Sequence, residues 1–202
     1  SSAASDVYKR QVLASFKPGN FLLQYGLNLN LDIPHLTLDN YKLLFTGKHD
    51  YWTWFGNSLI LTVITVILTL AISAFVAYGF AAYDFKGKNF FFIIVLLILS
   101  VPFEVIMLPL YKQISSWGMM DSYVSVVLPF LAHASTIFFF RQYLLGLPKS
   151  LIEAGRIDGA TEYGIFFKLI VPIMKPAFSA MAILNGMNAW NNYLCLLYTS
   201  DA

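Results

Sequence analysis

The stretch SLIEAGRIDGATEYG combines acidic side chains with glycines, a combination suited to contact with a partner molecule. Glu153 and Asp158 can each accept a charge-assisted hydrogen bond, which is stronger than a bond between neutral groups. Gly155 and Gly159 carry no side chain to block close approach, and glycine also permits the left-handed backbone of a tight turn. The simpler interpretation is a solvated helix face, and the residue types alone leave both interpretations open.

Other polar side chains lie inside apolar runs. Glu104 occurs in VPFEVIMLP, between Pro102 and Pro109, and an ionisable group within a membrane span is a candidate functional residue. Its place toward one end of the run equally fits a carboxylate wetted at the membrane surface. A second group recurs at helical spacing: Asn185, Asn188 and Asn192. Buried amides need partners, which are either neighbouring helices or a polar solute.

Signatures of catalysis are missing from the sequence. It has no phosphate-binding loop of the G-x-x-x-x-G-K type, no metal-ligand spacing and no nucleophile–base pair, and its histidines His35, His49 and His133 are isolated. We therefore predict that the chain is not an enzyme and holds no cofactor or metal, so that any energy for work comes from a partner. The net charge of +2 is too small to indicate nucleic-acid binding.

The composition indicates the elements that must position these residues. Hydrophobic residues make up 58% of the chain and charged residues 12%, whereas soluble domains are about one-quarter charged. Four apolar runs, at residues 57–82, 89–111, 122–145 and 173–194, are each long enough to cross a bilayer as a helix of about 20 residues. We predict an all-α, polytopic membrane protein. Its first run carries small and hydroxyl residues on one face, for helix packing or for lining a solute path: Thr62, Thr65, Thr69, Ser73 and Ala77.

The basic residues predict the orientation of these spans. Lys86 and Lys88 follow the first run, and five more basic residues lie in or near the segment after the third run, whereas the loop between the second and third runs has only Lys112. Loops rich in lysine and arginine remain in the cytoplasm. Residues 12–56 are then extracytoplasmic, and the SLIEAGRIDG segment is cytoplasmic.

That cytoplasmic segment, residues 146–172, is too polar to span and too long for a simple turn. Ser150 and Glu153 have the spacing of a capping box at a helix start. Gly159 suits a helix end, and Thr161 can open a second helix that continues to Pro172. We predict two short helices joined at Gly159, which form a docking surface for a soluble partner.

The same segment resembles the signature loop of permease subunits of ATP-binding-cassette (ABC) importers, which reads Glu-Ala-Ala, three residues, Gly, nine residues, Ile-x-Leu-Pro. Glu153, Ala154, Gly159 and Pro172 match in register, whereas Gly155 replaces the second alanine; Leu169 and Val171 are conservative departures. Several other stretches resemble the carbohydrate subfamily, specifically the maltose-type second permease: SFKP, LDNYKLLF, VPFEVIMLPLY, FRQYL, RIDGATE and WNNYL.

The resemblance implies a bacterial inner-membrane permease with six spans, of which four are present in residues 57–194. It implies a cytoplasmic ABC ATPase dimer, a second permease subunit, an extracytoplasmic solute-binding protein and membrane lipid as partners. The loop would couple to the ATPase through Glu153, Ala154, Gly155, Asp158, Gly159, Ala160 and Pro172. The solute would be a sugar or oligosaccharide. Glycerol phosphate or a polyamine is the alternative solute, and a membrane anchor or receptor that recruits a cytoplasmic protein is the alternative function.

The two ends of the chain form a separate problem. SSAASDVYKRQ, residues 1–11, and CLLYTSDA, residues 195–202, can be encoded by one DNA sequence read in opposite orientations. That DNA resembles a transposase adaptor of sequencing libraries. We therefore expect both segments, including the chain's one cysteine, Cys195, to be translated adaptor rather than native protein; the alternative is that both are native termini.

Overall fold

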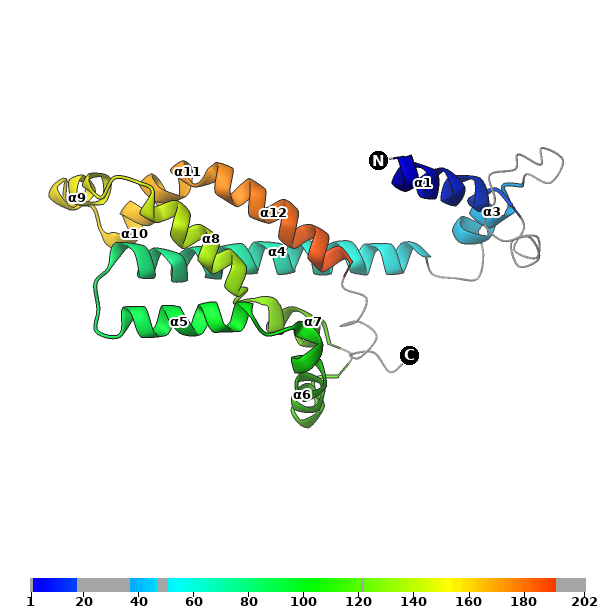
Figure 1. The fold of residues 1–202 in the computed structure, drawn as a ribbon, viewed down its shortest axis with the longest axis horizontal. Coiled ribbons are helices and arrows are strands. Elements are labelled where there is room, and N and C mark those ends of the chain that lie inside the picture. The colour runs from blue at the N-terminus through cyan, green and yellow to red at the C-terminus, as the bar shows by residue number, and fades with distance from the viewer. Residues whose placement is uncertain (1, 18–36, 47–50, 121, 192–202) are drawn as a thin grey trace. The chain divides into compact units, whose positions relative to one another are not determined.

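The computed structural model describes residues 2–17, 37–46, 51–120 and 122–191, and within these ranges every regular element is helical (Figure 1). The chain forms two compact units, Ser1–Asn57 and Ser58–Ala202. The prediction of an all-α protein is confirmed for the described residues. The segment 195–202 and Asn192 lie outside them.

The first unit contains α1 (Ser2–Ser15) and α3 (Asp39–Thr46). The Asn40 side chain donates to the carbonyls of Ser15 at 3.0 Å and Lys17 at 2.8 Å, and the Ser15 and Tyr41 hydroxyls lie 2.7 Å apart. These bonds are made to Ser15 and Lys17, which follow residues 1–11 in the chain. The origin of residues 1–11 as adaptor stays a prediction.

The helix α4 (Tyr51–Ala82) is the one described helix that is long and apolar enough by itself to cross a membrane. Its 32 residues correspond to about 48 Å at 1.5 Å per residue. It begins several residues before the predicted start at residue 57, so Trp52 and Trp54 belong to it and are exposed. Its buried residues confirm the predicted small and hydroxyl face, except that Thr62 is half-buried: Thr65, Thr69, Ser73, Ala74, Ala77 and Tyr78.

The other apolar runs are bent pairs of helices, and each could cross a membrane only if its pair forms one span. The helices α5 (Lys88–Leu99) and α6 (Phe103–Ser116) meet at 100°. Residues 89–111 therefore do not form one unbroken helix, although the two helices together are apolar enough for a broken span. The break falls at Pro102, which lacks an N–H donor and disfavours helical geometry at the residue before it, whereas Pro109 lies inside α6.

The remaining pairs bend less sharply. The helix α7 (Tyr123–Val127), with a short 3₁₀ turn at Leu128–Phe130, meets α8 (Ala134–Leu145) at 42°. The segment Glu162–Ile173 meets α12 (Lys175–Trp190) at 75°. The fourth run therefore begins two residues later than expected, at Lys175, and its described helix ends at Trp190.

Between α8 and α12 lies the polar segment, which contains α9 (Ser150–Ile157), α10 (Glu162–Ile165), a π-helical segment (Phe166–Ile170) and α11 (Val171–Ile173). Figure 1 shows α9 and α10 at the end of α4, with α8 and α12 returning along it. The core joins these elements, and Phe140 of α8 and Met174 before α12 have no exposed surface. The packed core therefore holds the polar hairpin against the membrane helices.

Candidate functional site

The hairpin α9–α10 turns at Gly159, as the sequence predicts. Gly159 has a φ of +75°, its N–H donates to the Arg156 carbonyl at 3.1 Å, and the Ala160 N–H donates to the Gly155 carbonyl at 3.0 Å. This pair of bonds is the Schellman motif, which satisfies the last carbonyls of a helix. At the next helix start, the Thr161 hydroxyl accepts from the Gly164 N–H at 3.1 Å. The turn and the second cap are confirmed.

The predicted capping box at Ser150 is wrong. The N-cap of α9 is Lys149, which makes no side-chain capping bond, and Ser150 is already the first helical residue. The Glu153 N–H donates to the Lys149 carbonyl at 3.2 Å, so it is not available to the Ser150 hydroxyl. Because the helix starts one residue earlier than the box requires, the Glu153 carboxylate has no role in capping.

Six of the seven predicted coupling residues are exposed, five of them on this hairpin and Pro172 on α11. These six are Glu153, Ala154, Asp158, Gly159, Ala160 and Pro172. Among the described residues, neither the Glu153 nor the Asp158 carboxylate has a hydrogen-bond or ion-pair partner. Ile157 beside them is 85% exposed. The hairpin thus presents two uncommitted carboxylates around an apolar side chain.

Gly155 has a different role from its neighbours. A Cβ at this position would lie 3.0 Å from Cγ1 of Ile165, a residue of α10 that is 2% exposed. The glycine therefore permits α9 to pack closely on α10 within the chain. The alanine of the family pattern would crowd this contact.

Glu162 forms a polar cluster that the sequence reasoning missed. Its carboxylate accepts from Arg156 Nε at 2.6 Å and from Arg156 Nη2 at 3.2 Å, a two-point contact across the hairpin turn. The hydroxyls of Tyr83 and Tyr78, at the end of α4, also donate to it at 2.7 and 3.4 Å. Glu162 thus joins both arms of the hairpin to α4. The signal available in the sequence was the opposite charge of Arg156 and Glu162 on either side of the predicted turn.

The protonation states in this cluster follow from its contacts. Burial and the hydrogen bond to Glu162 raise the pKa of the Tyr83 phenol, so Tyr83 remains a neutral donor at physiological pH. The hydrogen bond with Glu162 raises the pKa of the Arg156 guanidinium. The cluster is therefore a charged pair with neutral phenol donors.

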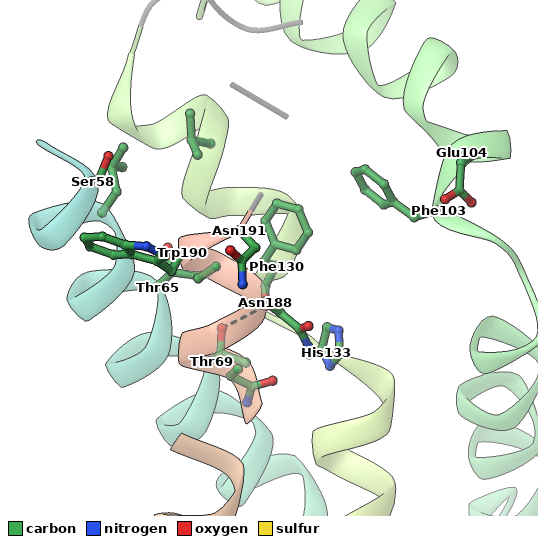
Figure 2. A pocket seen from close by; sticks show the side chains of 14 residues that line it. Ser58, Thr65, Thr69, Phe103, Glu104, Phe130, His133, Asn188, Trp190 and Asn191 are labelled. Atoms are coloured by element: carbon green, nitrogen blue, oxygen red, sulfur yellow. Dashed lines mark hydrogen bonds between the residues drawn. The ribbon is translucent and has the colours of Figure 1, made fainter. Parts of the chain in front are cut away.

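A cavity of about 430 Å³ lies between α4 and α12, and its α4 residues come from the half of that helix away from the hairpin (Figure 2). Its walls combine hydroxyl, amide and aromatic groups, and the aromatic groups include Phe130 and Trp190. Lysine and arginine are absent from the described residues that line it. The polar lining residues are Ser58, Thr65, Thr69, Glu104, His133, Asn185, Asn188 and Asn191. Such a surface suits the hydroxyl groups and ring faces of a neutral polar solute better than an anion.

The predicted polar residues of the spans line this cavity, but they differ in burial and in hydrogen bonding. Asn185 is buried, and its amide donates to the Thr136 hydroxyl of α8 at 3.0 Å, so it joins two helices. Asn188 is exposed to the cavity, and Glu104 is exposed across its opening beside Phe103 (Figure 2).

Three polar lining residues extend the predicted set: Ser58, His133 and Asn191. Asn191 and His133 were not singled out as lining residues, although Asn191 adjoins the predicted Asn192. Thr69 donates to the Phe130 carbonyl at 2.8 Å, the bond drawn in Figure 2. The small and hydroxyl face of α4 is thus divided, because Thr65 and Thr69 line the cavity whereas Ser73 and Ala77 are packed against other helices. No group of three or more potential metal ligands occurs among the residues that the structure describes.

Comparison with known proteins places the chain in a family. The family model for the binding-protein-dependent transport system inner membrane component matches residues 72–200, which include the hairpin and α12. The chain belongs to this family. The resemblance inferred from the signature loop is confirmed, and the protein is an inner-membrane component.

Individual relatives of this inner-membrane component are named as transport permeases. The arabinooligosaccharides transport system permease protein AraQ of Halalkalibacterium halodurans is 51% identical over 183 residues, which cover 91% of this chain and 66% of AraQ. The sn-glycerol-3-phosphate transport system permease protein UgpE of Pectobacterium atrosepticum is 36% identical, over 82% of this chain and 68% of UgpE. The chain spans about two thirds of the length of these relatives.

A solved structure has the same fold. A chain of a bacterial ABC transporter involved in the import of the acidic polysaccharide alginate matches with a TM-score of 0.80 and 23% identity, over 95% of this chain and 66% of that chain. The predicted fold class, an ABC-importer permease helical bundle, is thereby confirmed.

Proposed function

We propose that this chain is the permease subunit of an ABC importer that moves a sugar or oligosaccharide across the bacterial inner membrane. The observation that carries the proposal is the exposed hairpin at residues 150–165, whose Glu153 and Asp158 carboxylates have no partner in the described chain while Glu162 fixes the hairpin to α4. A rigid projection with uncommitted charges suits docking into another protein.

The partner of this surface is a cytoplasmic ABC ATPase dimer. Glu153 and Asp158 form charge-assisted contacts with basic groups of the ATPase, and Ile157 enters an apolar recess between them. A second permease subunit completes the pathway, and an extracytoplasmic solute-binding protein delivers the solute. The chain itself hydrolyses nothing, because the chemical energy enters through the ATPase.

The hairpin transmits motion as a rigid body. Closure of the ATPase dimer displaces α9 and α10, and the Glu162 cluster passes this displacement to α4. The aromatic stack between Phe75 of α4 and Phe166, with ring centroids 4.5 Å apart, gives a second connection. The cavity is lined by the other half of α4 and by α12. It then opens to the opposite side of the membrane.

The cavity forms part of the solute path. Asn188 and Thr65 donate to and accept from solute hydroxyls, Trp190 offers an aromatic face to a sugar ring, and Asn185 mainly joins helices through Thr136. Glycerol phosphate is a second candidate solute because UgpE is similar to this chain. Because the described part of the cavity lining has no lysine or arginine, it favours a neutral sugar over a phosphate ester or another anion.

Reconstituted uptake tests the proposal. The full-length permease, its partner permease, ATPase and binding protein are placed in proteoliposomes, and uptake of labelled arabinooligosaccharide is measured with ATP. Glu153→Ala should abolish most uptake while the membrane insertion of the permease is unchanged. Lys42→Ala, an exposed residue of α3, is the control. Normal uptake by Glu153→Ala would remove the coupling role.

The topology has its own measurement. A cysteine placed at Asp158 should react with an impermeant maleimide only when the cytoplasmic side is accessible. Labelling of intact cells from outside would invert the orientation and exclude an ATPase as the partner of the hairpin.

A further inference from the structure

A second polar cavity lies on the hairpin side of the spans, where α5 packs against α8. Its notable residue is Arg141 of α8, whose guanidinium carbon lies 3.8 Å from the centroid of the Phe92 ring on α5. The Nε atom is buried and has no hydrogen-bond partner in the described chain. An arginine keeps its charge at any physiological pH, and the Phe92 ring face attracts that charge without neutralising it. The guanidinium can therefore bind an anion from outside this chain.

The other charged residues that line the cavity, Asp84 and Lys88, do not supply an anion for Arg141. Lys88 donates to the Asp84 carboxylate at 2.9 Å and to the Tyr83 carbonyl at 2.8 Å. The hydrogen bond from Lys88 lowers the pKa of the Asp84 carboxyl, so the two residues form a neutral pair at neutral pH. The charge of Arg141 is then the one that remains uncompensated among the lining residues.

The cavity has the size and borders of a lipid headgroup site. Its volume is about 420 Å³, and Asn89, Phe90 and Arg141 are among the residues that line it. The Phe90 side chain is 64% exposed, as expected for a residue in contact with acyl chains. A guanidinium binds two phosphate oxygens at once. Basic pockets between membrane helices on the cytoplasmic side select anionic lipids.

We propose that Arg141 and Asn89 form a binding site for the headgroup of an anionic phospholipid in the cytoplasmic leaflet. Arg141 binds the phosphate diester, Asn89 donates to it, and the acyl chains lie along Phe90. Because Arg141 and Asn89 come from α8 and α5, the lipid stabilises the contact between these two helices.

Retained lipid is the direct test. The assembled transporter is equilibrated with vesicles of equal parts phosphatidylglycerol and phosphatidylethanolamine, and bound lipid is counted by native mass spectrometry. Wild type should retain phosphatidylglycerol preferentially, and Arg141→Gln should lower that retention about tenfold, the size expected for a lost charge-assisted contact. Lys86→Gln, an exposed residue outside the cavity lining, should retain as much as wild type. Equal retention by Arg141→Gln and wild type overturns the site.

A second variant separates binding from folding. Asn89→Asp keeps Arg141 and adds a carboxylate at an exposed position in the first turn of α5, where acidic residues are favourable for the helix. It should also lose phosphatidylglycerol, because the new charge repels the phosphate. Undiminished retention by Asn89→Asp contradicts the proposal. Displacement of the lipid from wild type by millimolar inorganic phosphate would instead identify a site for a small free anion.

Discussion

The two ends of α4 differ in how their polar groups are satisfied. Toward the hairpin, Tyr78 and Tyr83 donate to Glu162, and Glu162 also accepts from Arg156, so the polar groups are bonded within the chain. Toward the cavity, Thr65 belongs to the lining although little of it is exposed, and Asn188 is exposed on the facing helix. One end is thus fixed and the other is available to a ligand. A helix that moves as a rigid body needs both, because motion delivered at the fixed end must change the surroundings of the open end.

The largest expected effect concerns the turn that shapes the fixed end. Gly159→Asp places a side chain at a φ of +75° and adds a charge at the exposed tip. Left-handed backbone costs about 1–2 kcal/mol for most residues, but aspartate is among those that tolerate it, so the added charge at the exposed tip is the main perturbation. We expect uptake to be abolished, as measured in proteoliposomes.

A matched variant shows whether the position or the backbone strain is responsible. Gly118→Asp adds the same side chain at a φ of +66°, also in open space but outside the hairpin. It should retain most of its uptake. Equal loss of uptake in both variants would mean that the substitution itself, and not its position in the hairpin, causes the loss.

The next effect concerns the connection between the hairpin and α4. Glu162→Gln removes the charge of the two-point contact with Arg156 while the side chain keeps its shape. We expect transport per ATP hydrolysed to fall about tenfold, because a charge-assisted bond contributes more than a neutral one. The measurement compares ATP hydrolysis with uptake in one reconstituted sample.

The control for that variant is an acidic residue in an exposed pair. Asp39 lies 3.8 Å from Lys42 in α3, and both side chains are mostly exposed. Asp39→Asn should leave the ratio of uptake to hydrolysis unchanged. If Glu162→Gln behaves like Asp39→Asn, the Glu162 cluster is a structural contact with no part in transmission.

A smaller effect separates two amides at the open end. Asn185→Ala removes the bond to Thr136 and leaves that buried hydroxyl with only the 3.4 Å contact to His133 Nδ1, which costs about 1 kcal/mol of stability. Asn188→Ala should leave the unfolding temperature unchanged and weaken solute uptake, since this amide is exposed to the cavity. Thermal unfolding in detergent and uptake kinetics measure the two quantities. Unchanged kinetics in Asn188→Ala would remove it from the solute path.

The smallest effect tests packing within the hairpin. Alanine normally stabilises a helix by about 1 kcal/mol relative to glycine. Gly79→Ala, in α4, meets nothing within 4 Å and should show this gain, whereas Gly155→Ala meets Ile165 at 3.0 Å and should not. The difference between their unfolding temperatures measures the crowding. Equal gains would show that Ile165 moves aside without cost.

The sequence predicted the hairpin well because its signals are local. A glycine that permits positive φ and a threonine that caps a helix act within a few residues, and both lie where expected. Ser150 was misassigned because the helix could begin one residue earlier on the Lys149 carbonyl. The Glu162 cluster could not be predicted in the same way, since its Tyr83 contact joins residues far apart in the chain.

The apolar runs correctly predicted membrane-type helices, but they did not predict where these helices bend. Hydropathy indicates that residues 89–111 are apolar, but it does not distinguish a straight helix from one broken at Pro102. The asparagine spacing correctly brought Asn185 and Asn188 to one region, and only the structure distinguishes a bonded amide from an exposed one.

The π-helical segment Phe166–Ile170 determines the rotational phase between the hairpin and α12. It precedes Pro172, whose ring crowds the carbonyl four residues earlier and which has no N–H for it. A π-turn contains one residue more than the corresponding α-turn. Deleting one residue of this segment would restore regular α-helical winding. The hairpin would then rotate by about 100° relative to α12. The length of this one segment therefore sets which face of the hairpin meets α4.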